Sequence, residues 1–125
     1  MAEKFDLYWD PARPVLWEVL RPGVWAQAED DEYVDLLTEL LKDAPAGGFD
    51  VLSDASAYTM QPETSSDETY DMLADAGCRR FIQVVSKSII SLQTARMIRE
   101  SAAGNVIAYT ACSTIAEAEA ALNRS

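Results

Sequence analysis

Hydrophobic and polar residues alternate with a period of two near the start of the chain, which predicts a pair of β-strands. Phe5, Leu7 and Trp9 alternate with more polar neighbours, and residues 15–20 form a second run that is apolar except for Glu18. Two prolines lie between the runs and favour a turn. Strands joined by so short a loop are expected to pair antiparallel.

Further along the chain, apolar residues recur every three or four positions, which predicts helices. The helices are expected over residues 29–43, 65–76, 89–103 and 114–123, and further strands over 49–54, 81–85 and 106–110. The predicted inward stripes are Tyr33, Leu36, Leu37, Leu40 and Leu41 in the first helix, Leu92, Ala95, Ile98 and Ala102 in the third, and Ile115, Ala118 and Leu122 in the last. Thr114 with Glu117, and Ser65 with Glu68, have the spacing of a capping box, and Gly77 and Gly104 are expected to end the second and third helices.

These elements predict an α/β fold in which an N-terminal strand is followed by four strand–helix units. The units cover residues 15–43, 49–76, 79–103 and 105–124. Such alternation indicates right-handed crossovers and a mainly parallel, five-stranded sheet. With 125 residues and no long linker, we expect a single domain over 1–125.

The charge of the chain is strongly negative and unevenly distributed. The sequence has 21 acidic and 10 basic residues, a net charge of −11. Residues 1–78 hold 18 acids and 4 bases (net −14), and residues 79–125 hold 3 acids and 6 bases (net +3). The uneven charge indicates either two differently solvated faces or a surface that selects a partner. The acidic surface argues against binding to nucleic acid.

No apolar leader and no uninterrupted apolar run of membrane-spanning length is present, so we expect a cytoplasmic protein without a membrane span. Cys78 and Cys112 are expected just before one strand and just after the next, at opposite ends of neighbouring parallel strands. They would lie roughly 20 Å apart and stay reduced. Because the chain has no histidine and only these two cysteines, we expect no metal site and no cofactor.

The order of elements resembles the STAS superfamily, the SpoIIAA-like domains related to anti-sigma-factor antagonists. The residues that carry the resemblance are Phe49-Asp-Val-Leu-Ser-Asp54 as a central strand, and Val106-Ile-Ala-Tyr-Thr110 followed by Ala116-Glu-Ala118. In detail the chain is most similar to the STAS/SEC14-type bacterial proteins of unassigned role. The resemblance implies a SpoIIAA-like fold and a regulatory role through protein contact.

The sigma-regulating members have a phosphorylatable serine in an Asp-Ser-Ser-Gly motif after the central strand. The matching stretch here is Thr64-Ser65-Ser66-Asp67, in which only the two serines agree. Ser65 and Ser66 therefore have two interpretations, as helix caps or as a regulated phosphorylation site.

Polar side chains also follow the predicted strands at their carboxyl ends, where parallel sheets bind ligands. They are Asp54, Ser56, Ser86, Lys87 and Ser113. A small anionic or hydroxylated ligand would suit these groups, although serines at helix starts also serve as caps. Lys87 beside Ser86 is the one candidate for nucleophilic chemistry, and no catalytic motif accompanies it. Arg96 and Arg99 share a helical face that is either solvated or able to bind a carboxylate or phosphate.

The sequence therefore predicts a non-enzymatic binding or regulatory domain with a protein partner, which is another protein or a second copy of itself. The alternatives are a carrier of a small apolar ligand or lipid, implied by the SEC14-like kinship, and an enzyme of unknown class. A homodimer is expected from the polar residues Glu18, Asp50, Gln83 and Thr110 within the strands, which suggest a partly covered sheet.

Overall fold

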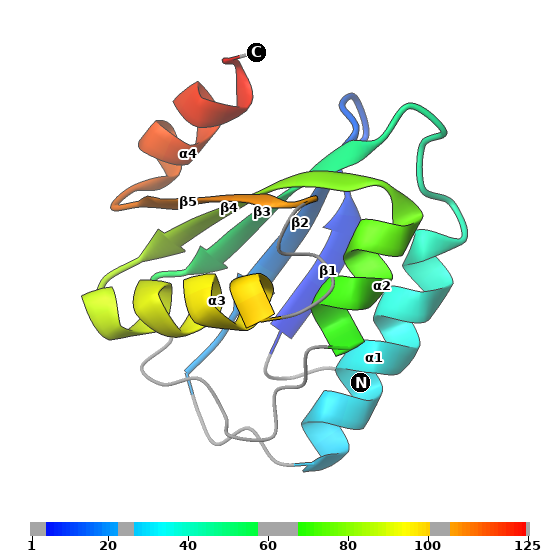
Figure 1. The fold of residues 1–125 in the computed structure, drawn as a ribbon, viewed down its shortest axis with the longest axis horizontal. Coiled ribbons are helices and arrows are strands. Elements are labelled where there is room, and N and C mark those ends of the chain that lie inside the picture. Colours follow the sequence, from blue (N-terminus) through cyan, green and yellow to red (C-terminus); the bar gives the residue numbers. More distant parts are fainter. Residues whose placement is uncertain (1–4, 23–26, 58–67, 101–105, 125) are drawn as a thin grey trace.

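The computed structural model describes residues 5–22, 27–57, 68–100 and 106–124. Strands and helices alternate along these segments (Figure 1). They are β1 (Phe5–Trp9), β2 (Val15–Leu20), α1 (Gln27–Leu41), β3 (Phe49–Ala55), α2 (Glu68–Ala76), β4 (Cys78–Val85), α3 (Ser88–Glu100), β5 (Ala108–Cys112) and α4 (Ile115–Leu122). The predicted fold class, an N-terminal strand followed by four strand–helix units, is confirmed.

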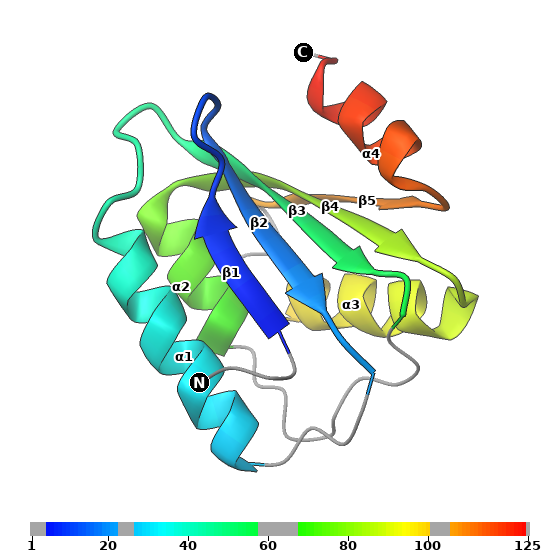
Figure 2. The ribbon, with the colours of Figure 1, turned by 180° about the vertical axis from the view of Figure 1, so that it is seen from behind.

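The five strands stand side by side in the order in which they occur in the chain. β1 and β2 form the expected antiparallel hairpin, and β2 to β5 are parallel. Each right-handed crossover therefore advances in the same direction, which places its helix on the same face of the sheet. Figures 1 and 2 show α1, α2 and α3 on that face and α4 alone on the opposite face.

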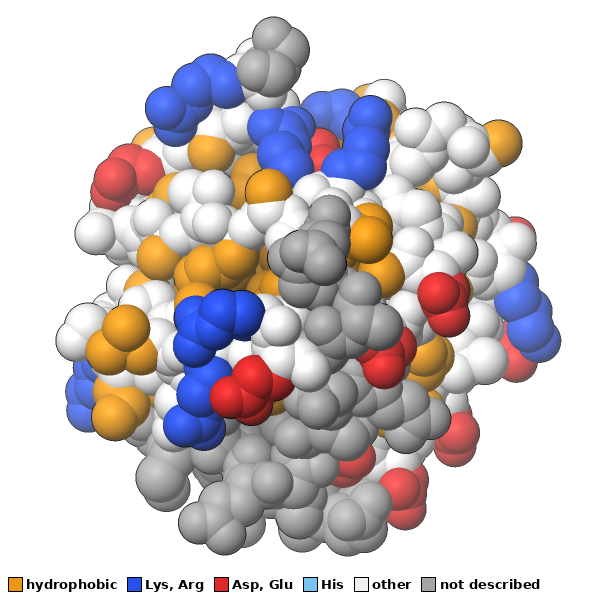
Figure 3. Space-filling view, in the orientation of Figure 1, with side chains coloured by type: hydrophobic (Ala, Val, Ile, Leu, Met, Phe, Trp, Pro, Cys, Tyr) orange, Lys and Arg blue, Asp and Glu red, His pale blue; other side chains and the backbone are white. Residues whose placement is uncertain are grey.

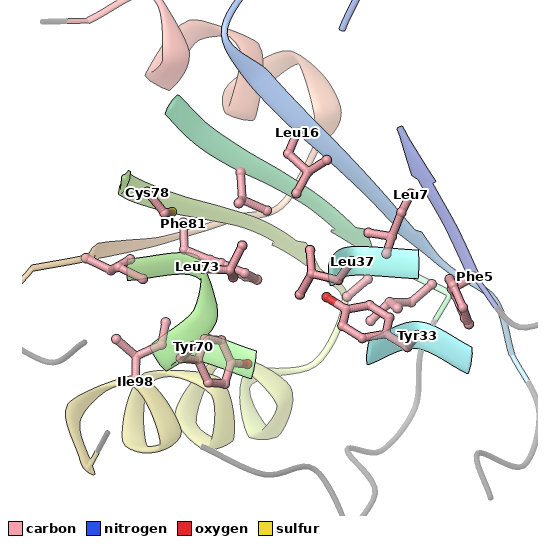
Figure 4. Packing of buried hydrophobic residues seen from close by; sticks show 14 of the residues in the cluster. Phe5, Leu7, Leu16, Tyr33, Leu37, Tyr70, Leu73, Cys78, Phe81 and Ile98 are labelled. Atoms are coloured by element: carbon pink, nitrogen blue, oxygen red, sulfur yellow. The ribbon is translucent and has the colours of Figure 1, made fainter. Parts of the chain in front are cut away.

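The larger core lies between the sheet and the helices α1 to α3 (Figure 4). Alternate strand residues point into it, and helix residues four positions apart meet them, as expected from the two side-chain periods. Its buried members include Phe5, Leu7, Leu16, Phe49, Val51 and Phe81 from the strands and Tyr33, Leu37, Leu73, Ile90 and Ile98 from the helices. Trp9 packs at its margin, edge-on to Phe49, and its indole N–H donates to the carbonyl of Leu40 at 2.9 Å.

The smaller core lies under α4 on the opposite face of the sheet. Val15, Leu52 and Ile82 meet Ala118 and Ala121 there, all of them buried. A short helix that buries alanines gains little apolar contact, so polar contacts carry much of its attachment.

Arg80 fastens the C-terminal end of α4 to the sheet. Its guanidinium forms a bidentate pair with the buried carboxylate of Asp50, at 3.0 Å and 2.7 Å. The same guanidinium donates to the carbonyl oxygens of Ala121, Leu122 and Arg124 at 2.9, 3.0 and 2.7 Å. These carbonyls lie at the C-terminal end of α4 and carry partial negative charge, so a cation is favoured there.

A second set of polar contacts fastens the turn of the β1–β2 hairpin to the same helix. Arg13 pairs with Glu119 of α4 at 2.8 Å and with Asp10 at 3.0 Å. Asp10 also accepts the indole N–H of Trp17 at 3.0 Å. A hydrogen bond from the backbone N–H of Ala12, with side-chain hydrogen bonds from Arg13 and Trp17, holds the pKa of Asp10 well below its usual value.

Several helix ends were predicted from their capping residues. The side chain of Thr114 accepts the backbone N–H of Glu117 at 3.1 Å, which confirms the cap of α4. Gly77 has a φ of +108°, a conformation that glycine adopts without strain, and it ends α2 as expected. Ser65 and Gly104 lie outside the described residues.

The strand boundaries differ from the prediction at β4 and β5. β4 begins at Cys78, and not at 81, while β5 spans Ala108–Cys112, and not 106–110. β5 is an edge strand of mostly small, exposed residues, so its sequence has little alternation to mark where pairing starts. Within the described segments, no helix has the length and apolar character needed to cross a bilayer.

Two of the predicted inward stripes were partly wrong. Leu92 of α3 is 69% exposed, and the buried residues of that helix are Ile90, Thr94 and Ile98. Ile115 of α4 is 38% exposed, because Ala118 and Ala121 form the face that meets the sheet. In α1, by contrast, Tyr33 and Leu37 are buried and the other predicted residues pack beside them.

Both cysteines are buried and free, at opposite ends of neighbouring strands. Cys112 lies opposite Val84, far along β4 from Cys78. We expect denatured, unreduced protein to react with two equivalents of a thiol reagent, measured by absorbance. In the folded protein Cys78 should react more slowly than Cys112, because burial raises the pKa of Cys78 to about 12. Fewer than two reactive thiols would contradict this placement.

Replacing Arg80 should destabilise the fold strongly. Arg80→Ala leaves the Asp50 carboxylate buried without a partner, and we expect a loss of about 3 kcal/mol in the free energy of unfolding, measured with urea. Asp50→Asn in the same chain should recover part of this loss. Arg79→Ala is the control, because Arg79 is the exposed neighbour on the same strand and should cost under about 0.5 kcal/mol. Equal losses for the two arginines would contradict the role of Arg80.

Candidate functional site

The residues predicted at the carboxyl ends of the strands lie along one edge of the sheet. The register aligns Asp54, Val84 and Cys112 across β3, β4 and β5, so the residues that follow them share this edge. The Asp54 carboxylate accepts from Ser56, from its backbone N–H at 3.1 Å and from its hydroxyl at 2.6 Å. The structure therefore brings Asp54 and Ser56 together in a local turn.

Ser86, Lys87 and Ser113 are exposed at the same edge and are not joined to that turn. Among the described residues, no hydrogen bond or ion pair links any of the three to Asp54 or Ser56. The backbone carbonyl of Lys87 accepts the N–H of Ile90 at 3.1 Å, so this residue opens α3. Ser65 and Ser66 lie outside the described residues.

A row of buried polar side chains crosses the sheet beneath α1 to α3. The strand register places Glu18, Ser53 and Gln83 beside one another on β2, β3 and β4. All three are buried. Because they share a face with Leu16 and Val51, they point toward the helices and away from solvent.

Hydroxyl groups satisfy the carboxyl group of Glu18 on both sides. The hydroxyl of Tyr33 in α1 donates to one oxygen at 2.8 Å, and that of Ser53 donates to the other at 3.2 Å. Burial raises the pKa of Glu18, and the two hydroxyl bonds offset only part of this effect. Burial beside this carboxyl also raises the pKa of Tyr33.

Gln83 has its own partner at the other end of the row. The hydroxyl of Tyr109 on β5 donates to its side-chain oxygen at 2.5 Å. Burial raises the pKa of Tyr109 well above its usual value. Glu18 and Ser53 therefore bond to each other and Gln83 bonds to Tyr109, which gives the row a structural role.

The buried row corrects the reasoning behind the expected homodimer. Glu18 and Gln83 do not mark a partly covered face, because helices cover them, and Asp50 is buried in its pair with Arg80. Thr110 alone is exposed, on the edge strand β5. The sequence contains a signal for the burial of Glu18. It lies two positions from each of the inward residues Leu16 and Leu20, and residues two apart in a strand face the same side of the sheet.

The outward side of α3 carries the most prominent exposed apolar side chains of the described chain. Ile89 is 55% and Leu92 69% exposed, and Arg96 and Arg99 follow them on the same side. We call these four residues the α3 stripe. Figure 3 shows apolar and basic side chains next to one another on the surface where α3 lies.

The described residues contain no group of three or more His, Cys, Asp or Glu side chains able to hold a metal ion. Comparison with protein-family models, with curated proteins and with solved structures finds no match to this chain. The candidate site is therefore defined by this structure, and its most distinctive surface feature is the α3 stripe.

Replacing Glu18 should change how stability depends on pH. A carboxyl whose pKa is raised by folding holds its proton in the native state over a range in which the unfolded chain has lost it. Stability therefore falls as pH rises above about 4.3, the ordinary pKa of glutamate. Glu18→Gln keeps the size without the charge, and its amide can accept from one hydroxyl and donate to the other, so its stability relative to wild type should increase with pH.

Urea unfolding near pH 4.5 and near pH 7.5 measures this difference. Glu39→Gln is the matched control, because Glu39 is exposed and pairs with Lys42 on the surface. The same pH trend in both variants would contradict the assignment to the buried carboxyl.

Proposed function

We propose that this chain is a non-enzymatic binding domain of the STAS-like type that acts through protein–protein contact. The order of its elements supports the STAS-like part of the proposal, since a strand precedes four strand–helix units as in that superfamily. The observation that carries the contact function is the exposure of Ile89 and Leu92 on one side of α3.

Large apolar side chains gathered on one exposed face are typical of interaction surfaces. In α3 they are not the remains of an incompletely packed core, because Ile90, Thr94 and Ile98 already fill the inward side. On the solvent side, no residue of the described chain covers Ile89 and Leu92. A partner that covers them would remove their apolar area from water.

The strand-end residues support binding over catalysis. Asp54 and Ser56 bond to each other, and Lys87 is exposed without contact to either. A nucleophile needs a base within hydrogen-bond reach, and these groups do not provide that arrangement. The carboxyl group of Glu18 is bonded to buried hydroxyls, which suits a structural role.

Photo-crosslinking tests the proposal at a single position. A photoreactive residue in place of Leu92 should give a specific adduct in cells, because this side chain would lie inside the contact. Unlabelled wild-type protein should compete the adduct away, and unlabelled Leu92→Ser should not. The control places the same photoreactive residue at Asp75, which is exposed on α2. Equal adducts from both positions, or none from position 92, would contradict the proposal.

A further inference from the structure

We propose that the α3 stripe binds an acidic amphipathic helix of a partner protein. This inference rests on the proposed contact function and adds the chemistry of the partner. It is carried by the spacing of the four residues, by their charges and by the distribution of charge over the rest of the chain.

The spacing of the α3 stripe is that of a helix–helix seam. Ile89, Leu92, Arg96 and Arg99 are separated by three, four and three residues, which are alternating a and d positions of two heptads. Such a line runs straight along a helix and fits a second helix laid beside it. The first two positions offer apolar side chains, and the next two offer aliphatic stems with charged ends.

The two arginines have no ion pair in the described structure. Arg99 lies in the last turn of α3, where a cation also suits the helix dipole, so its position alone says little. Arg96 lies a turn earlier and has no such explanation. An acidic side chain on the partner would complete a bidentate pair with each guanidinium.

The negative charge of the rest of the chain disfavours a nucleic acid or an anionic membrane as the partner. With a net charge of −11, the molecule as a whole repels an extended anionic surface. Asp35 of α1 and Asp75 of α2 are exposed on helices that lie on the same face of the sheet as α3 (Figure 1). A flat membrane or a nucleic acid would approach these carboxylates, whereas a single helix laid along α3 meets the α3 stripe and, among the acids, only Glu100 at its end in the described segment.

A second copy of the chain is a poor complement to this surface. Neither α1 nor α2 exposes a large apolar side chain among the described residues. α4 exposes Ile115, but the acid one turn later, Glu119, is already paired with Arg13. The α3 stripe contains no acid, so an α3–α3 contact between two copies would not place an acid of the stripe opposite Arg96 and Arg99. The occupant we propose is therefore a different protein.

Synthetic peptides test the proposed chemistry directly. The probe is a helical peptide with leucines and glutamates along one face, and its match carries lysines in place of the glutamates. Fluorescence anisotropy with the whole protein should show roughly tenfold tighter binding of the glutamate peptide. Leu92→Ser should weaken the binding of the glutamate peptide.

Reversing the charge of Arg96 tests whether this arginine distinguishes the glutamate peptide from the lysine peptide. Arg96→Glu should weaken the glutamate peptide roughly fivefold and improve binding of the lysine peptide. Arg79→Glu makes the same change in net charge on another exposed arginine and should leave both affinities unchanged. Circular dichroism of each variant confirms that the fold is retained.

Four outcomes would overturn the proposal. They are equal affinity for the two peptides, binding of neither, binding of anionic phosphatidylserine vesicles in preference to the glutamate peptide, and a wild-type dimer in sedimentation that Leu92→Ser dissociates. If one of these occurs while the crosslink at position 92 persists, the contact function stands and the partner's chemistry is wrong. If the crosslink also fails, the contact function itself is wrong.

Discussion

The structure depends on one topological constraint, which is that each strand is added beside its predecessor in chain order. Right-handed crossovers in a single direction place α1, α2 and α3 on the same face of the sheet. The opposite face would then be uncovered, and only α4, which follows the last strand, is left to cover part of it. Because α4 buries small side chains, Arg80 and Arg13 hold it in place through ion pairs and helix-end carbonyls.

The same constraint explains why α3 has an exposed side. It is the last helix in the row and packs over β4 and the edge strand β5. Its inner residues Ile90 and Ile98 complete the large core, and no further crossover adds a helix beyond it in the described chain. The apolar and basic residues on its outer side are therefore available for a partner without any loss to the fold.

Beneath the helices, the buried polar row ties the strands to one register. Glu18, Ser53 and Gln83 stay in line only when β2, β3 and β4 pair as observed. A slip of one residue would turn Glu18 to the opposite face and separate its carboxyl from Tyr33. The cost of burying these groups is offset by the hydrogen bonds that they share with the hydroxyls of Tyr33 in α1 and Tyr109 in β5.

The sequence by itself determined the elements, their order, the parallel sheet and the separation of Cys78 from Cys112. These follow from local periodicity and from the limited ways in which strand–helix units can be connected. It did not determine which side of α3 faces inward, because that helix has apolar residues on two sides, with Leu92 on one and Ile90 on the other. Burial of one side depends on where β4 and β5 lie beneath the helix, and that position is a property of the assembled sheet.

Tertiary structure likewise decided which partners the charged residues have. Asp50 and Arg80 are thirty positions apart, and no local pattern pairs them, yet neighbouring strands place them side by side. The partners of Glu18 come from α1 and β3. The period of two in β2 indicates that Glu18 is buried, but it does not indicate which residues form its hydrogen bonds. Periodicity reports which side of an element is apolar, whereas a contact between distant residues exists only once the chain has folded.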